Sequence, residues 1–560
     1  KISLNLQTMS ERFKWLDSYP SFVSETIDTK KYSSLLEVFD NAVSKFGDHV
    51  AFQNMDVKLT YNQLNDNVNA LAWYIQNKTD LKPGDRVAIQ MPNLLQYPVA
   101  MFAILKTGLI VVNTNPLYTP DEMLHQYKDS GIKGIILLEN FASNFQSIEN
   151  QLNVSTVIVT RIGDMLGGLK GGLVNFVVKR VKKMVPNYEL KNSVSFKTIL
   201  KQSSGKIPKD VAISLSDPAF LQYTGGTTGL SKGATLTHGN MCANLAQADE
   251  WLTGLFNEGE DIIITALPLY HIFALTANCL TFFKYGSKNV LITNPRDMKS
   301  FISDMKKNPF SFITGVNTLF NGILNQPDFK NLDFSKLKIS LAGGMALQDS
   351  VAHKWKEVTG SNVIEAYGLS ETSPAAIMNP TDGTHKIGTI GLPISSTEIL
   401  ILDDDKNPVP KGGEGEIAIK GPQVMAGYWN KQEETAESMF GDYFLTGDIG
   451  VMDDDGFFSI VDRKKEMICV SGFNVYPSEV EAVIYNHPKV LEVGVRSEPD
   501  EKSSEAVMAF VVKKDDTLTE QEIKDYCREH LTAYKVPRKV VFRDELPKSN
   551  VGKILRRLLT

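Results

Sequence analysis

Residues 86–112 read RVAIQMPNLLQYPVAMFAILKTGLIVV, and this stretch decides the fold class. Apolar side chains alternate at positions 87, 89 and 91, which is typical of a strand. The run Pro98–Lys106 then predicts a helix, and Leu109–Val112 predicts a second strand. Strand, helix and strand within one short stretch indicate a unit of parallel sheet with a helical crossover.

The same alternation continues on both sides of this stretch. Thr60 and Gln63 have the spacing of a capping box, and the apolar positions after them predict an amphipathic helix. Further short apolar runs lie at 135–138 and 157–159. We therefore expect α/β layers built on mainly parallel sheet.

The pattern changes after about Lys386. Short apolar runs at 398–402, 416–420 and 457–461 are separated by Gly- and Pro-rich turns, which predicts a β-rich, barrel-like subdomain. Beyond a charged stretch, two strand-like runs and a helix at 519–530 predict a small α+β domain. The expected fold class is α/β: a large N-terminal domain (1–461) of two α/β subdomains plus the β-rich subdomain, a hinge (462–466), and a small mobile C-terminal domain (467–560).

Length and composition narrow the function classes. A chain of 560 residues is too long for one hydrophobic core, so several domains are expected. The net charge of -6 provides no basic field for nucleic acid, and none is expected as a partner. Four cysteines without a CxxC pair favour the reducing cytoplasm over a disulfide framework.

The apolar run in the middle of the chain and the N-terminus bear on membrane insertion and secretion. The run Ala266–Phe283 is long enough to suggest a membrane span, but it contains Pro268, His271 and Asn278, so we expect buried core. No secretory signal pattern is visible at the N-terminus, and Met9 is a candidate for the natural first residue.

The strongest local motif is residues 223–233, YTGGTTGLSKG. Its four glycines let the backbone approach an anion closely, three threonine hydroxyls add donors, and Lys232 adds a positive charge. The alternative is an ordinary Gly-rich surface turn. The motif does not fit the Walker A pattern, so a nucleotide phosphate would be held in another way.

Several motifs in order along the chain, from about Tyr32 to Arg557, resemble the acyl-adenylate-forming (ANL) superfamily of acyl-CoA synthetases, luciferases and peptide-synthetase adenylation domains. The sequence is especially similar to bacterial long-chain fatty acid–CoA ligases. The segments that carry this similarity are MPNLLQYP (91–98), YHIFAL (270–275), ITGVNTLF (313–320) and VSGFNVYP (470–477).

The resemblance implies a nucleotide site. In the motif EAYGLSET (365–372), Tyr367 would stack on adenine and Glu371, together with Thr224, would bind Mg²⁺ between the phosphates. The carboxylate of Asp448, in Thr446-Gly447-Asp448, would hold the ribose, although the same tripeptide is often only an Asx turn. The implied ATP and AMP contacts are Thr224, Gly225, Gly226, Thr227, Thr228, Gly229, Lys232, Gly344, Tyr367, Gly368, Thr372, Asp448, Arg463, Lys465 and Lys553.

The resemblance also implies two poses of the C-terminal domain. In the first, Lys553 of the final motif PKSNVGKILRR (547–557) would bridge the substrate carboxylate and the α-phosphate; the alternative is a basic tail, to which Lys548, Arg556 and Arg557 could belong. In the second, rotation about Lys465 would bring a CoA channel of Ser471, Gly472 and Phe473 to the site.

The acid pocket is expected near His271, with Asn317 and Gly343; a core histidine is the alternative for His271. No aspartate stands where amino-acid-activating relatives bind an ammonium, and the surrounding side chains are apolar, so an alkyl chain is favoured. Three positions depart from the family pattern: Gly226 for a frequent Ser, Ser231 for a frequent Pro, and Leu275 for a gating Trp.

The predicted function is an AMP-forming long-chain fatty acid–CoA ligase with catalytic Lys553, Glu371 and His271, with Mg²⁺ as cofactor and with fatty acid, ATP and CoA as partners. Alternatives are an aryl- or medium-chain acid–CoA ligase, a fatty acyl-AMP ligase, and a lipid-binding protein without catalysis. A homodimer is a further candidate assembly.

A contact with the inner face of the cytoplasmic membrane is a further expectation. In residues 171–185, five valines share one helical face and four cations cluster beside them, which is typical of a helix that lies on an anionic bilayer. An ordinary surface helix is the alternative. The valines are Val174, Val177, Val178, Val181 and Val185, and the cations are Lys179, Arg180, Lys182 and Lys183.

Overall fold

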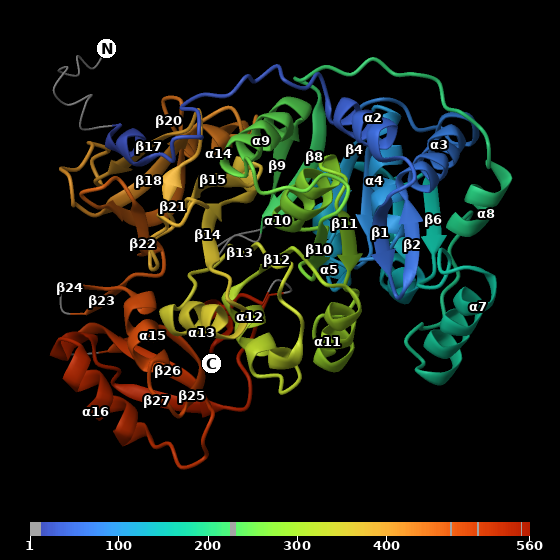
Figure 1. The fold of residues 1–560 in the computed structure, drawn as a ribbon. Helices are drawn as coiled ribbons and strands as arrows, with labels where there is room; N and C mark the ends of the chain where they lie inside the picture. The colour runs from blue at the N-terminus through green and yellow to red at the C-terminus, as the bar shows by residue number, and fades with distance from the viewer. Residues whose placement is uncertain (1–12, 225–230, 471–472, 501–502, 550–551) are drawn as a thin grey trace.

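The computed structural model describes residues 13–224, 231–470, 473–500, 503–549 and 552–560, and its strands form four sheets (Figure 1). The first sheet contains the stretch 86–112 and is parallel from β8 to β7. Its strand order is β19 (Gly427–Tyr428), β9 (Lys232–Thr237), β8 (Pro218–Thr224), β4 (Ile110–Asn113), β3 (Arg86–Gln90), β5 (Ile132–Leu138), β6 (Thr156–Thr160) and β7 (Val194–Ser195).

The second sheet is also parallel through its centre, from β14 to β1. Its strand order is β16 (Leu392–Pro393), β15 (Ala375–Met378), β14 (Val363–Gly368), β13 (Ile339–Ala342), β12 (Phe312–Gly315), β10 (Ile262–Thr265), β11 (Lys288–Leu291), β1 (Val50–Asn54) and β2 (Val57–Thr60). The predicted α/β class with mainly parallel sheet is confirmed.

One hydrophobic core joins the two large sheets. Helix α4 (Gln96–Lys106) lies in it with ten of its eleven residues buried, which explains why its sequence is apolar on all sides. Helix α3 (Tyr61–Lys78) packs against α4 and begins at the predicted capping box, where both hydrogen bonds of Thr60 and Gln63 are present. Helices α2 (Leu35–Phe46) and α9 (His238–Trp251) also contribute buried side chains to this core.

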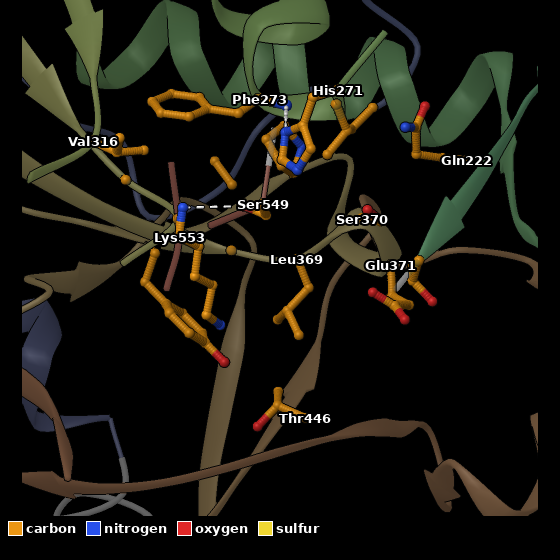
Figure 2. Close-up of a pocket in the computed structure, with 18 of the residues that line it drawn as sticks. Gln222, His271, Phe273, Val316, Leu369, Ser370, Glu371, Thr446, Ser549 and Lys553 are labelled. Carbon is orange, nitrogen blue, oxygen red and sulfur yellow. Dashed lines mark hydrogen bonds between the residues drawn. The ribbon is translucent and has the colours of Figure 1, made fainter. Parts of the chain in front are cut away.

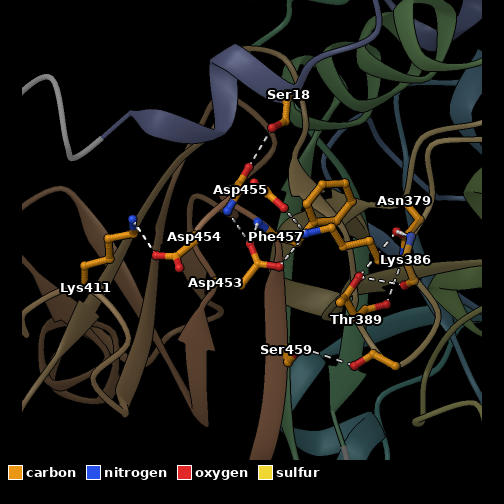
Figure 3. Close-up of polar contacts among 11 residues, drawn as sticks. Ser18, Asn379, Lys386, Thr389, Lys411, Asp453, Asp454, Asp455, Phe457 and Ser459 are labelled. Carbon is orange, nitrogen blue, oxygen red and sulfur yellow. Dashed lines mark hydrogen bonds and ion pairs between the residues drawn. The ribbon is translucent and has the colours of Figure 1, made fainter.

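The predicted β-rich region is an antiparallel sheet. Its strands are β17 (Glu398–Leu402), β18 (Gly415–Lys420), β21 (Tyr443–Met452), β20 (Met439–Phe440) and β22 (Phe458–Arg463). Lys386 joins the β21–β22 turn to the second sheet, because its ammonium lies 2.7 Å from carboxylate oxygens of both Asp453 and Asp455 and above the ring of Phe457 (Figure 3). Strands β21 and β22 carry Asp448 and Arg463, two of the predicted nucleotide contacts.

The C-terminal residues form a fourth, five-stranded sheet. Its strand order is β24 (Phe473–Val475), β23 (Ile468–Val470), β26 (Ser504–Lys513) and β25 (Val490–Asp500), and β27 (Lys539–Arg543) pairs with β26. Helices α15 (Pro477–Tyr485) and α16 (Glu520–His530) pack on it around a separate core. The domain boundaries at 461–462 and 466–467 stay predictions.

The amphipathic segment 171–185 differs from its prediction. It begins inside α7 (Gly168–Phe176), continues through the π-helix η4 (Val177–Val181) and ends four residues after it. A helix lying on a bilayer would expose its valine face, but of the five valines only Val181 is exposed. Val185 is buried and the other three are half-buried, so this part of the prediction is wrong. The exposed apolar side chains are Leu169, Leu173, Phe176, Val181 and Met184.

The run Ala266–Phe283 is buried core, as predicted. It includes α10 (Ile272–Ala274) and the π-helix η5 (Leu275–Phe282), which packs against α9 and β11. None of the helices in the described part of the chain combines the length and the hydropathy that a membrane span requires.

Candidate active site

A cavity of about 1560 Å³ opens where the carboxyl ends of parallel strands of both large sheets meet the C-terminal domain. Strand β8 ends at Thr224, β14 ends at Gly368, and β13 is followed by Gly343 and Gly344; all four residues line the cavity. Ligands of open α/β sheets bind at this edge because the strand ends leave a crevice there. The edge therefore brings together motifs that lie far apart in the sequence.

The two ends of the Gly-rich loop face the cavity. Thr224 pairs with Lys232 across β8 and β9, and both line the wall. The ammonium of Lys232 lies 5.0 Å from the centre of the Tyr428 ring. Gly225, Gly226, Thr227, Thr228 and Gly229 lie outside the described residues, so their predicted phosphate contacts stay predictions.

Tyr367, Asp448 and Arg463 form one polar cluster, although they come from β14, β21 and β22. The Tyr367 hydroxyl donates to Asp448 Oδ2 at 2.6 Å, and Arg463 Nε lies 2.6 Å from Asp448 Oδ1. Burial raises the pKa of Asp448, while the guanidinium of Arg463 opposes that shift. Tyr367 and Arg463 line the cavity, whereas Asp448 lies buried behind them and is not part of its lining, so its predicted ribose contact stays a prediction.

Glu371 lies on the short helix η7 (Ser370–Thr372), which packs against β8 and β9 (Figure 2). Its carboxylate is buried, which raises its pKa, and it accepts a 2.7 Å hydrogen bond from the Tyr428 hydroxyl. Tyr428 was not singled out in the sequence, where no local pattern marks it. Its hydroxyl orients the Glu371 carboxylate, and its ring lies beside the Lys232 ammonium.

The donor set fits Mg²⁺ but requires the substrate to complete it. No group of three or more His, Cys, Asp or Glu residues within the described ranges could hold a metal ion. Mg²⁺ is commonly bound by one or two carboxylates together with substrate phosphates. The carboxylate of Glu371 and the hydroxyl of Thr224 are oxygen ligands of that kind.

Lys553 reaches the cavity from the C-terminal domain (Figure 2). Its backbone N–H donates to Ser549 Oγ at 3.1 Å, which closes the turn that presents the side chain. Burial lowers the pKa of Lys553, and the nearby guanidinium of Arg463 lowers it further. Such a site favours an anionic partner for the ammonium.

Arg556 connects this turn to the predicted hinge. Its guanidinium binds Glu481 at 2.6 Å and 2.8 Å, Asp462 at 3.0 Å, and also Glu466. Asp462 is almost fully buried and accepts a further hydrogen bond from the Ser478 N–H. Arg556 is thus more than part of a basic tail, and Lys465 of the same hinge lines the cavity.

His271 lines the cavity beside Phe273 and Gly343. Its Nδ1 accepts the N–H of Phe273 at 3.4 Å, and burial lowers its pKa to about 4. The imidazole is therefore neutral at pH 7, and its Nε2 carries the proton that can be donated into the cavity.

From His271 the cavity extends as an arm between α9, η5 and strands β12 and β13. Most side chains of this arm are small or apolar, and the large ring of Trp251 stands in its wall; Asn244 and Gln247 of α9 are polar residues that also line the cavity. Burial of an alkyl chain there would contribute about 0.8 kcal/mol for each CH₂. The side chains of the arm are Ala248, Trp251, Leu252, Thr276, Ala277, Thr281, Phe282, Phe312 and Ile339.

Besides Asp448, three predicted residues do not line the cavity. Asn317 accepts the N–H of Gln348 at 3.0 Å, and the buried Thr372 donates to Leu369 O; neither lines the cavity. Phe473 is 57% exposed and stacks on Tyr534, away from the cavity. Ser471 and Gly472 lie outside the described residues, and the roles of all five residues stay predictions.

Comparisons with known proteins agree with this geometry. A family model described as AMP-binding enzyme matches residues 39–429, and one described as AMP-binding enzyme C-terminal domain matches residues 479–553. The chain is 51% identical over 545 residues to the long-chain-fatty-acid–CoA ligase of Yersinia pestis, and the match covers 97% of each.

Solved structures have the same fold. The structure of an anthranilate CoA ligase in complex with anthranoyl-AMP superposes with a TM-score of 0.83 at 23% identity, covering 95% of this chain and 98% of the other. An O-succinylbenzoate coenzyme A synthetase from Bacillus subtilis, in complex with ATP and magnesium ion, has a TM-score of 0.74 at 25% identity, covering 93% and 98%.

Proposed function

This chain belongs to the AMP-binding enzyme family, and we infer that it is an ATP-dependent long-chain-fatty-acid–CoA ligase. The near full-length identity to ligases of that name carries this inference. The reaction joins a fatty acid to AMP with release of pyrophosphate, and then transfers the acyl group to CoA with release of AMP.

We propose that the first half-reaction takes place in the pose described here. The attacking carboxylate and the α-phosphate are both anions, so their approach needs positive charge in a site of low dielectric. The ammonium groups of Lys553 and Lys232 enter the cavity from opposite domains. Mg²⁺ held by Glu371 and Thr224 would offset further phosphate charge.

The acid would lie in the arm that begins at His271. The neutral imidazole donates from Nε2 to the fatty acid carboxylate and orients it without neutralising its charge. The alkyl chain then extends between α9 and η5 towards Trp251. Each further methylene that enters the arm adds binding energy, which would select long chains.

The second half-reaction needs a different pose. Lys553 occupies the cavity while Phe473 faces away on the surface of the C-terminal domain, so both cannot serve the site at once. We propose that the domain rotates about the hinge at 462–466, which withdraws Lys553 and brings the loop of Phe473 to the site.

We also propose a peripheral contact with an anionic membrane at its cytoplasmic face, where fatty acids partition from water. The segment 171–185 supports it, because apolar side chains and cations share its exposed surface.

Pyrophosphate release measured over fatty acids of increasing length, with and without CoA, tests the function. We expect release with long-chain acids, and AMP together with acyl-CoA only when CoA is added. Absence of both acyl-AMP and pyrophosphate with every acid would contradict the proposed function, and preference for aryl acids would contradict the substrate class.

A further inference from the structure

A second pocket, of about 560 Å³, lies beside α7 and shares no lining residue with the active-site cavity. It is enclosed by α7 with η4, the loop after β6, and the start of α8 (Phe196–Gln202). Four cationic side chains line it: Arg161, Lys179, Arg180 and Lys197. None of these residues takes part in the ligase mechanism described above.

The pocket also contains two carboxylates, Glu139 and Asp164, and both interact with residues of the pocket itself. Glu139, with a side chain only 2% exposed, lies 3.5 Å from Arg161 Nε and 3.9 Å from Lys179 Nζ. Asp164 accepts the N–H of Arg161 at 2.9 Å and a hydrogen bond from Asn175 at 3.4 Å. Four cations against two carboxylates leave a positive surplus, which lies on the exposed Arg180 and Lys197.

Next to the pocket, α7 exposes apolar side chains to solvent. Leu169, Leu173 and Phe176 are 94%, 64% and 59% exposed, and their spacing of four and three residues places them on one helical face. Val181 and Met184 extend the exposed apolar surface past the helix. A row of large apolar side chains exposed on one helical face is typical of a surface that binds another molecule or a membrane.

The body of the protein holds this helix in place with the face outward. The Gly163 N–H donates to Asn175 Oδ1 at 2.7 Å, and Gly171 approaches the backbone of Gly163 so closely that a Cβ at Gly171 would lie 2.1 Å from the Gly163 carbonyl oxygen. In Figure 1, α7 projects from the side of the molecule away from the C-terminal domain. Docking through α7 would therefore leave that domain free to rotate.

We propose that this pocket binds the phosphate of an anionic phospholipid headgroup while Leu169, Leu173 and Phe176 enter the outer acyl layer of the same bilayer. Guanidinium and ammonium donors suit phosphate oxygens, and the apolar face beside them suits a lipid rather than a free anion. The inference rests on the proposed membrane contact of a fatty-acid ligase and names its lipid class and residues.

Co-sedimentation of the full chain with vesicles tests this site. The vesicles are phosphatidylcholine alone or phosphatidylcholine mixed with phosphatidylglycerol. We expect clear preference for the anionic vesicles, a loss of roughly tenfold or more in Arg180→Gln/Lys197→Gln, and a comparable loss in Leu173→Ser/Phe176→Ser. Equal binding to both vesicle types, or unchanged binding of the charge variant, would overturn the proposal.

A matched control removes two positive charges elsewhere. Lys330→Gln/Lys336→Gln changes two exposed lysines of another surface and should bind anionic vesicles as the unchanged chain does. If this control lost as much vesicle binding as Arg180→Gln/Lys197→Gln does, the loss would come from net charge alone, and the proposed site would be wrong. If inorganic phosphate raises the Tm of the protein while the vesicles do not bind, the pocket takes free phosphate and the lipid assignment falls.

Pyrophosphate release from a soluble medium-chain acid without vesicles separates this inference from the ligase function. All variants should keep the rate of the unchanged chain, because the pocket lies outside the cavity. Absence of pyrophosphate release by the unchanged chain with every acid tested would contradict the function itself, whatever the vesicles show.

Discussion

The hydroxyl of Thr318, on helix α12 (Asn317–Leu324), donates a 3.1 Å hydrogen bond to the carbonyl of Gly552, the residue directly before Lys553. Gly552 has φ of +83°, and a Cβ there would lie 2.6 Å from Thr318 Oγ1. Only glycine allows this turn and this approach together. The contact thus holds the Lys553 turn against the N-terminal domain in the pose that we propose for adenylation.

Thr318→Val tests this hydrogen bond. Valine keeps the shape of the side chain but cannot donate to Gly552 O, so we expect adenylation to slow by about fivefold, which corresponds to about 1 kcal/mol for one hydrogen bond. Thiolysis of supplied acyl-adenylate should stay unchanged, and Thr318→Ser should restore adenylation. Equal slowing of both half-reactions would show that Thr318 has a merely structural role.

Ala277→Phe tests the acyl arm. Ala277 lies on η5 and lines the arm six residues after His271, so a phenyl group there should block the path of a long alkyl chain. We expect activity with long-chain acids to fall by about tenfold or more while activity with short acids persists. The short acids serve as the control for folding. A uniform loss across chain lengths would contradict the assignment of the arm.

Glu365→Gln tests how a buried carboxyl affects stability. Burial raises the pKa of Glu365 from 4.5 to about 7, and its side chain accepts the Leu347 N–H at 3.1 Å. The folded chain therefore binds this proton more tightly than the unfolded chain, so Glu365 lowers stability as pH rises from about 4.5 to 7.

Glutamine keeps the acceptor and removes the titration. We expect the variant to gain up to about 3 kcal/mol over the unchanged chain at pH 8 and nothing at pH 4.5. Thermal unfolding at both pH values measures the difference. A variant that is no more stable than the unchanged chain at pH 8 would contradict this explanation.

Local sequence patterns predicted most of the fold. Thr60 and Gln63 make both hydrogen bonds of the expected capping box, and Thr519 caps α16 in the same way. Such signals depend on neighbours a few residues away, so they can be found in the sequence. The valines of 171–185 show the limit, because periodicity tells which residues share a face but not which face the body covers.

The candidate site was predictable in its motifs but not in its supporting contacts. Asn317 and Thr372 belong to motifs that line the cavity, but neither side chain reaches it. Asn317 accepts a hydrogen bond from the Gln348 N–H, and Thr372 donates one to a backbone carbonyl of its own turn. Tyr428, Thr318 and Arg556 act on residues distant in the chain, and no local pattern reports such contacts.

We propose that the Lys553 ammonium serves adenylation alone and leaves the site before thiolysis. Lys553→Ala, assayed separately for acyl-adenylate formation and for transfer of supplied acyl-adenylate to CoA, tests it most directly. We expect adenylation to be abolished and transfer to be largely retained. Equal loss of the two half-reactions would contradict the claim.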